Sequence, residues 1–102
     1  MSDDNILIVC AGWKGKINLE DSLFAGALVD TLRKYIEPDC DAPIIAQELY
    51  LSAKDDMVKF LSTSSHVKRL NRLNIHKDIA FCLTPDKYSV IPILKRGELT
   101  LL

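Results

Sequence analysis

The stretch CAGWKGKINLED, residues 10–21, joins the end of an apolar run to the expected start of a helix. The run before it, NILIVCAG (residues 5–12), is apolar throughout and closed by glycine, which favours a β-strand covered on both faces. After the glycines, Asn18 offers an N-cap, and Asn18-Leu19-Glu20-Asp21 approximates a capping box with an acid at its last position. The stretch therefore predicts a strand, a glycine turn and a helix.

This helix is expected to run to about Glu37, because Pro38 stops it. Its predicted core-facing stripe contains Asp21, Ala25, Leu28, Leu32 and Ile36. A weaker stripe of Leu23, Gly26 and Ala27 has small residues that would let another backbone approach closely. Because Asp21 continues the core-facing stripe into the first turn, its carboxylate is expected to point towards the glycine loop.

The rest of the chain predicts more helices and a terminal pair of strands. Residues 42–53 are apolar on nearly every face, which indicates a buried helix or an interface. A third helix begins at the Ser52/Asp55 capping pattern, a fourth at Ser64 or Ser65, and a short fifth spans residues 76–83. Inward positions of the third and fourth are Met57, Phe60, Leu61, Val67, Leu70 and Leu73, with Asn74 as a C-terminal cap. Residues 88–102 predict strand, Arg96-Gly97 turn and strand.

The predicted fold class is therefore α/β, with a few-stranded sheet flanked by four or five helices. An apolar strand implies two covered faces, yet few strands are available to build the sheet. We expect the sheet to be part of something larger.

Composition sets outer limits on the function. The 102 residues form one domain, and 48% hydrophobic with 26% charged residues is typical of a folded globular chain. A net charge of -1 gives no support for nucleic-acid binding, and no apolar run approaches the ~20 residues of a membrane helix. The acidic start is the wrong sign for a secretory signal. Three distant cysteines predict reduced thiols in a cytoplasmic protein, with Cys10 and Cys82 buried.

The glycine loop, residues 12–16, matches neither common nucleotide-binding motif. The phosphate-binding loop of nucleotidases needs four residues between its first glycine and Gly-Lys-Ser/Thr, but this loop has two and places Ile17 at the hydroxyl position. The dinucleotide motif Gly-x-Gly-x-x-Gly is also absent. A glycine turn before a helix can still offer backbone N–H groups to an anion, with Lys14 and Lys16 adding positive charge. Glu20 and Asp21 would suit a Mg²⁺ ion carried with that anion. On spacing alone, ordinary turn chemistry and helix electrostatics are the favoured explanation.

Other polar and aromatic residues have ordinary structural explanations. Lys68, Arg69 and Arg72 are expected on a solvated helix face, and His66 and His76 are expected to be structural. Trp13 is expected to cover the core.

Short motifs along most of the chain, taken in order, resemble a known family. They are Ala11-Gly12, Gly15, Glu20-Asp21, Ala25-Gly26, Ala46-Gln47 with Tyr50, residues 66–83, Ile91-Pro92 and Gly97-Glu98-Leu99. In this order and spacing the chain is similar to the C-terminal half of the 2-phosphosulfolactate phosphatase family, the ComB-like proteins. Trp13-Lys14 is not a fixed part of that pattern, and Cys10 stands where relatives carry a polar side chain.

The resemblance implies a Mg²⁺-dependent phosphatase that hydrolyses 2-phospho-3-sulfolactate to 3-sulfolactate and phosphate, a step in coenzyme M biosynthesis. It also implies that residues 1–102 are the C-terminal domain of a protein whose N-terminal domain is missing, so that the chain alone is inactive. A homodimer is expected for a separate reason, because the helix at residues 42–53 has too few polar positions to leave one side in water. Asp21 is the expected Mg²⁺ ligand or water-orienting group, and Glu20 supports it. The backbone around Gly12 and Gly15, with Lys14, is expected to bind the substrate anion. The rival hypotheses are a non-catalytic dimerisation domain and a module that binds a phosphorylated or sulfonated metabolite without turnover.

Overall fold

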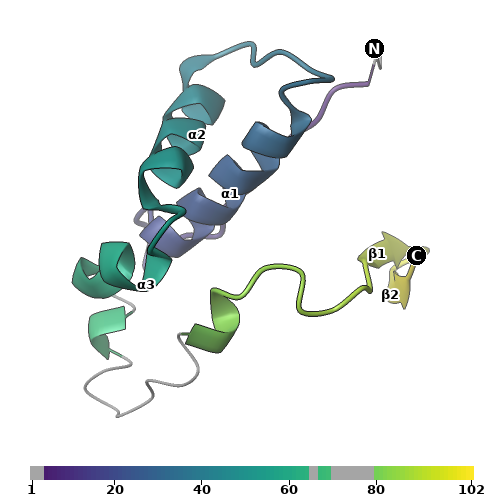
Figure 1. Cartoon of the computed structure of the whole chain (residues 1–102). Coiled ribbons are helices and arrows are strands. Elements are labelled where there is room, and N and C mark those ends of the chain that lie inside the picture. The colour runs from purple at the N-terminus through teal and green to yellow at the C-terminus, as the bar shows by residue number, and fades with distance from the viewer. Residues whose placement is uncertain (1–3, 65–66, 70–79) are drawn as a thin grey trace.

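The structure, a computed structural model, describes residues 4–64, 67–69 and 80–102. It combines helices with a two-stranded antiparallel sheet, so the predicted partial α/β class is confirmed. The elements are α1 (Leu19–Leu32), α2 (Asp41–Ala53), α3 (Met57–Phe60), the 3-10 turn η1 (Leu61–Thr63), β1 (Pro92–Lys95) and β2 (Glu98–Leu101) (Figure 1). Residues 67–69 and 80–82 are also helical. Leu70, Leu73, Asn74, Arg72, His66 and His76, for which predictions were made, lie outside the described residues.

Helix α1 begins where the sequence predicts and ends five residues earlier than expected. The Asn18 side chain accepts a hydrogen bond from the backbone N–H of Asp21 at 2.8 Å, which satisfies one of the free donors of the first turn. The helix ends at Leu32, and Tyr35 donates its N–H to the Leu32 carbonyl in a tighter turn. Pro38 disfavours helical geometry at the residue before it, so the chain turns before reaching Glu37.

Helices α1 and α2 run side by side and in opposite directions (Figure 1). The buried residues of α1 are Leu23, Ala25, Gly26 and Val29. A Cβ atom on Gly26 would lie only 2.0 Å from the carbonyl oxygen of Ala46, so the two backbones touch at this glycine. The predicted close approach at the small-residue stripe is therefore confirmed. The stripe through Leu28 and Leu32 is only partly buried, because the contact with α2 turns the other stripe inward.

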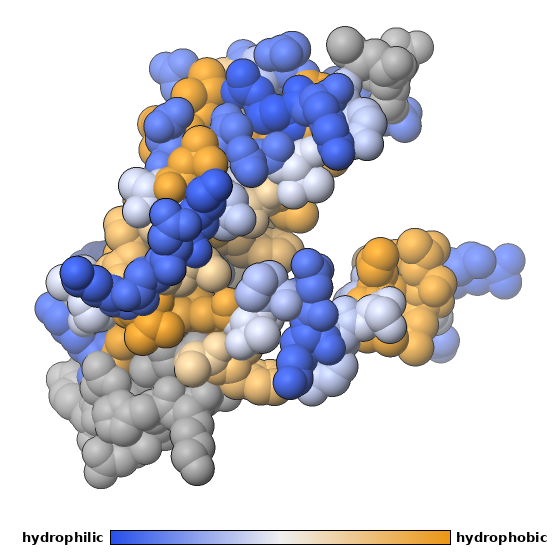
Figure 2. Space-filling view, viewed as in Figure 1, coloured by the Kyte–Doolittle hydropathy of each residue, from blue (hydrophilic) through white to orange (hydrophobic). Residues whose placement is uncertain are grey.

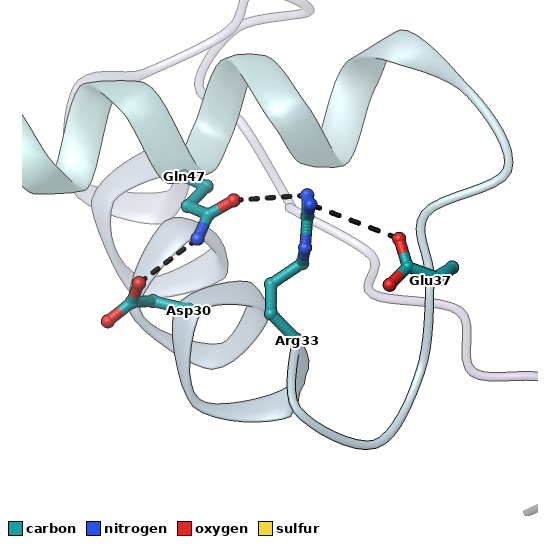
Figure 3. A network of polar contacts seen from close by, with 4 residues as sticks. All are labelled: Asp30, Arg33, Glu37 and Gln47. Atoms are coloured by element: carbon teal, nitrogen blue, oxygen red, sulfur yellow. Dashed lines mark hydrogen bonds and ion pairs between the residues drawn. The ribbon is translucent and has the colours of Figure 1, made fainter. Parts of the chain in front are cut away.

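A polar network joins the same two helices near the end of α1 (Figure 3). Gln47 on α2 donates from Nε2 to Asp30 Oδ1 at 3.0 Å, and its Oε1 accepts from Arg33 at 3.3 Å. The Arg33 guanidinium lies 3.9 Å from Glu37. Gln47, one of the few polar residues of α2, thus uses both ends of its amide to fix the alignment of the helices.

The core lies where α1, the end of α2 and η1 meet. Its buried members are Leu23, Ala53, Leu61 and Val67, and its partly buried neighbours are Leu19, Leu49, Met57, Phe60 and Leu83. The inward positions predicted for the third helix are thereby confirmed, although its cap is Asp56, which accepts from the Lys59 N–H. The Ser64 hydroxyl accepts a hydrogen bond from the Val67 N–H, the first of the helical residues 67–69, at 3.0 Å.

The predicted C-terminal strand–turn–strand is confirmed as the β1–β2 hairpin. Lys95 pairs with Glu98 across Arg96 and Gly97, whose φ values of 53° and 80° match the two-residue turn that suits strand twist. The hairpin stands apart from the helices (Figure 1) and is covered with apolar side chains (Figure 2). Leu99, for instance, is 78% exposed.

Residues 5–12 do not form the predicted strand, and the prediction is wrong for this structure. They form no regular secondary structure, and their apolar side chains face solvent, with Leu7 85% and Val9 79% exposed. Among the described residues, β1 and β2 pair only with each other, so residues 5–12 have no neighbouring strand with which to form hydrogen bonds. Cys10 and Cys82 are exposed, which corrects the prediction that they are buried; both are free thiols.

The chain exposes more surface than a compact monomer of its size. Its accessible area is 8542 Å², whereas a folded monomer of this mass exposes about 5,800 Å². Its radius of gyration is 15.2 Å, against about 13 Å for a compact domain of this length. Residues 5–11 and 84–102, which are mostly exposed, contribute to this excess. In the part that the structure describes, no helix is long and apolar enough to cross a membrane.

Candidate functional site

The glycine loop is a miniature hairpin. Trp13 and Lys16 exchange backbone hydrogen bonds of 2.9 and 3.0 Å, and Lys14 and Gly15 form the turn between them. Both turn residues have positive φ, 52° and 73°, as in the tight turns that join twisted strands. The backbone groups of Trp13 and Lys16 are therefore satisfied within the loop.

Gly12 connects this hairpin to the start of α1. Its φ is +72°, and a Cβ atom there would lie 2.5 Å from the Lys16 carbonyl oxygen, so only glycine fits without a shift. Its N–H donates to Oδ2 of Asp21 at 2.8 Å. The structure thus places the Asp21 carboxylate against the glycine loop, where the sequence predicts it.

Asp21 completes only half of the expected capping box. Asn18 accepts from the Asp21 N–H, but the Asp21 carboxylate turns to Gly12 instead of back to Asn18. The partner of this carboxylate in the structure is a backbone N–H, whereas the sequence suggested a Mg²⁺ ion. The thiol of Cys10 lies 3.6 Å from the Asp21 carbonyl oxygen, so the end of the 5–12 segment also reaches the first turn.

Glu20 lies next to Asp21 in sequence but faces another partner. Its Oε1 accepts a hydrogen bond from the hydroxyl of Ser64, which is 5% exposed. Its Oε2 is buried and has no hydrogen-bond partner among the described residues. Adjacent helical residues point about 100° apart. The structure therefore does not bring the two carboxylates to one point.

The described acidic side chains at the start of α1 offer Mg²⁺ one carboxylate, that of Asp21. Within the described ranges, no three or more His, Cys, Asp or Glu side chains gather where they could hold a metal ion. Asp21 keeps one carboxylate oxygen that accepts no described hydrogen bond, which suits a single ligand. Protein-bound Mg²⁺ commonly takes one or two carboxylates, with water and substrate phosphate as its other ligands. Asp21 fits that role, and the other ligands would come from outside the described residues.

Trp13 belongs to the loop hairpin, and its side chain is partly exposed instead of covering the core. Its side chain is 43% exposed, and the ammonium of Lys14 lies 5.8 Å from its ring centroid. The guanidinium of Arg69 lies 5.1 Å from the same ring. Arg69 and Lys68 are exposed, as predicted, but sequence reasoning missed the contact of Arg69 with the loop. No spacing in the sequence could have found it, because the fold brings residue 69 to residue 13.

Comparison with known proteins adds the family. The family model described as 2-phosphosulpholactate phosphatase matches residues 1–97, so the chain belongs to the 2-phosphosulfolactate phosphatase family. The resemblance predicted from the sequence is thereby confirmed.

Individual relatives agree with this assignment. A "Probable 2-phosphosulfolactate phosphatase" of Thermotoga petrophila is 38% identical over 96 residues, covering 94% of this chain and 41% of the relative. Proteins of the same name from Caldanaerobacter subterraneus and Pseudothermotoga lettingae are 35% and 40% identical, covering 94% and 88% of this chain and 40% and 39% of their own lengths. The chain thus spans about two fifths of these relatives. No solved structure matches it.

Proposed function

We propose that this chain is part of a Mg²⁺-dependent phosphatase that hydrolyses 2-phospho-3-sulfolactate to 3-sulfolactate and phosphate. The observation that carries the proposal is the family match over residues 1–97. The contact between Asp21 and Gly12 supports it, because it holds a carboxylate at a fixed place beside an exposed, lysine-bearing loop.

In this proposal Asp21 is the catalytic carboxylate of the chain. Hydrolysis of a phosphate ester depends mainly on positioning and on neutralising charge, and bound Mg²⁺ would supply that neutralisation. Asp21 would orient the attacking water or ligate the metal through its second oxygen, while its Oδ2 stays on Gly12. Lys14 would attract the substrate anion, and Gly12 and Gly15 shape the loop that carries Lys14. Glu20 would support Asp21 while its own carboxylate stays hydrogen-bonded to the Ser64 hydroxyl.

The remaining polypeptide found in relatives would complete the enzyme. The chain covers 41% of the Thermotoga petrophila relative, so most of that protein has no counterpart here. We propose that the chain alone is inactive, and that a missing N-terminal domain pairs with residues 5–10. The exposed side chains of Ile44, Ile45 and Leu51 on α2 support a homodimer, and the three free cysteines support a cytoplasmic location.

The proposal is tested by phosphate release from 2-phospho-3-sulfolactate with Mg²⁺ and with a chelator. Three samples are compared: the chain alone, the unmatched part of the Thermotoga petrophila relative alone, and both produced together. We expect turnover only from the combined sample with Mg²⁺, and none after chelation. Turnover by the chain alone, or unchanged turnover in chelator, would overturn the corresponding statement.

Glycerol phosphate serves as the control substrate. Equal turnover of the two phosphoesters would contradict the assigned substrate while leaving a phosphatase. Binding of the phosphosulfolactate without any hydrolysis by the combined sample would favour the rival function, an anion-binding module.

A further inference from the structure

Two cations lie near the indole of Trp13, one from the next residue and one from a distant part of the chain. Lys14 comes from the turn of the loop hairpin, and Arg69 comes from the helical stretch 67–69. Both lie within the range of a cation–π interaction. All three side chains reach solvent, so a small solute can approach them.

Neither cation has an anionic partner in the described part of the chain. No described hydrogen bond or ion pair involves the Lys14 ammonium or the Arg69 guanidinium. The two acids at the start of α1 each accept a hydrogen bond through one oxygen, Asp21 from the Gly12 N–H and Glu20 from the Ser64 hydroxyl, and no ion pair joins either of them to these cations among the described residues. Both cations lie within about 6 Å of the same ring centroid, and an anion between them would interact favourably with each charge.

The chemistry of these side chains specifies the ligand. A guanidinium held against an aromatic ring keeps its N–H donors in a rigid fork, which matches the paired oxygens of phosphate, sulfonate or carboxylate. Lys14 adds a mobile charge on a four-carbon stem, and the indole adds an apolar wall beside the anion. We propose that Arg69, Lys14 and Trp13 form a subsite for the oxyanion of a small molecule.

This assignment adds side chains to the loop backbone as anion-binding groups. The N–H groups of Gly12, Trp13 and Lys16 already donate hydrogen bonds to Asp21 and within the hairpin, which leaves only the turn residues Lys14 and Gly15 without a described N–H partner. The subsite rests on the proposed function for the identity of its ligand, because a phosphosulfolactate carries both a phosphate and a sulfonate. Arg69 is then a substrate-binding residue additional to those predicted from the sequence.

Trp13 is the only tryptophan of the chain, so its fluorescence reports on this place alone. The 102-residue chain is titrated with inorganic phosphate and, separately, with methanesulfonate, at constant ionic strength set with chloride. We expect a saturable change with at least one of them, and the one that binds more tightly identifies the group that the subsite takes. Arg69→Gln and Lys14→Gln should each weaken binding at least tenfold, about 1.4 kcal/mol.

Two variants make the test specific. Arg69→Lys keeps the charge but loses the fork, and should weaken binding several-fold. Lys34→Gln removes a cation that lies 5.2 Å from the ring of Tyr35, and should leave binding unchanged. Circular dichroism establishes that each variant is folded. The proposal is overturned if no saturable change occurs, if chloride alone reproduces it, or if Arg69→Gln binds like the parent.

Failure of the subsite and failure of the proposed function give different results. In the combined sample, Arg69→Gln should raise KM for the phosphosulfolactate at least tenfold while changing kcat little. An active enzyme whose KM is unchanged by Arg69→Gln would refute the subsite alone. Saturable, Arg69-dependent binding in a sample that never hydrolyses the ester would refute the proposed function alone.

Discussion

Asp21 stands where the start of α1, the end of the 5–12 segment and the glycine loop meet. Its Oδ2 accepts from Gly12, while its own N–H is capped by Asn18. Asparagine is nearly isosteric and can present its carbonyl oxygen to Gly12. In the combined enzyme, Asp21→Asn should therefore lower kcat at least tenfold and leave Tm nearly unchanged. Phosphate-release assays and thermal unfolding measure the two effects.

Asn18→Ala is the matched control for that substitution. It removes the cap and should cost about 1 kcal/mol of stability, with little loss of kcat at temperatures where the protein stays folded. Full activity combined with lowered stability in Asp21→Asn would show that this carboxylate is structural.

Substitution by alanine should destabilise the protein to different extents at the two glycines of this loop. At Gly12 a Cβ atom meets the Lys16 carbonyl oxygen at 2.5 Å and φ is positive, whereas at Gly15 φ is positive but nothing lies within 4 Å. Gly15→Ala should cost about 1–2 kcal/mol from backbone conformation alone. Gly12→Ala should cost more, because the Lys16 carbonyl must also move. Denaturant unfolding of both variants measures the difference, and equal losses would contradict the close contact.

At the scale of elements, Gly26 decides how closely α1 and α2 approach. Alanine favours a helix over glycine by about 1 kcal/mol, so an isolated α1 would gain stability from Gly26→Ala. In the folded chain the new Cβ would meet Ala46 at 2.0 Å and the Tyr50 Cβ at 2.7 Å. Overpacking typically costs 1–3 kcal/mol, so we expect net destabilisation, measured by denaturant midpoint.

Thr31→Ala tests the same helix without the contact. Thr31 is exposed, and its hydroxyl only bonds back to the Ala27 carbonyl. This variant should be neutral or slightly stabilising. If Gly26→Ala raised stability as Thr31→Ala does, the two helices would not pack through Gly26.

Across the whole molecule, the exposed apolar side chains of residues 5–10 predict that this segment binds another polypeptide. Residues 5–10 make no described backbone hydrogen bond, and Leu7 and Val9 are almost fully exposed. Amide hydrogen exchange should be fast at residues 6–9 in the chain alone, and slow when the unmatched part of the relative is present. Pairing with a strand would protect alternate amides, because a strand directs its N–H groups to opposite edges.

The β1–β2 hairpin supplies the internal control for exchange, since its ladder is already formed in the chain alone. Light scattering separates the two sources of protection. Slow exchange at residues 6–9 in the chain alone, together with a dimeric mass, would mean that a second copy covers the strand. Fast exchange in the combined sample would contradict pairing altogether.

Capping and turn residues in the sequence predicted where helix α1 begins and where the terminal hairpin turns. Asn18 before an acidic turn located the start of α1, and Arg96-Gly97 located the hairpin. Each depends on the conformational preference of one or two residues and their nearest backbone groups. The direction of Asp21 towards the loop was also predicted, although the stripe used to predict it, through Leu28 and Leu32, is only partly buried.

The order of residues was thus enough to indicate the family, the helix start at Asn18 and the terminal hairpin. The packed fold was needed to show which stripe of α1 is buried, that Glu20 turns to Ser64, and that Arg69 reaches Trp13. It also decided that residues 5–12, strand-like in sequence, are unpaired here. The physical reason is that local preferences act within a few residues, whereas burial and pairing depend on surfaces contributed from elsewhere in the chain.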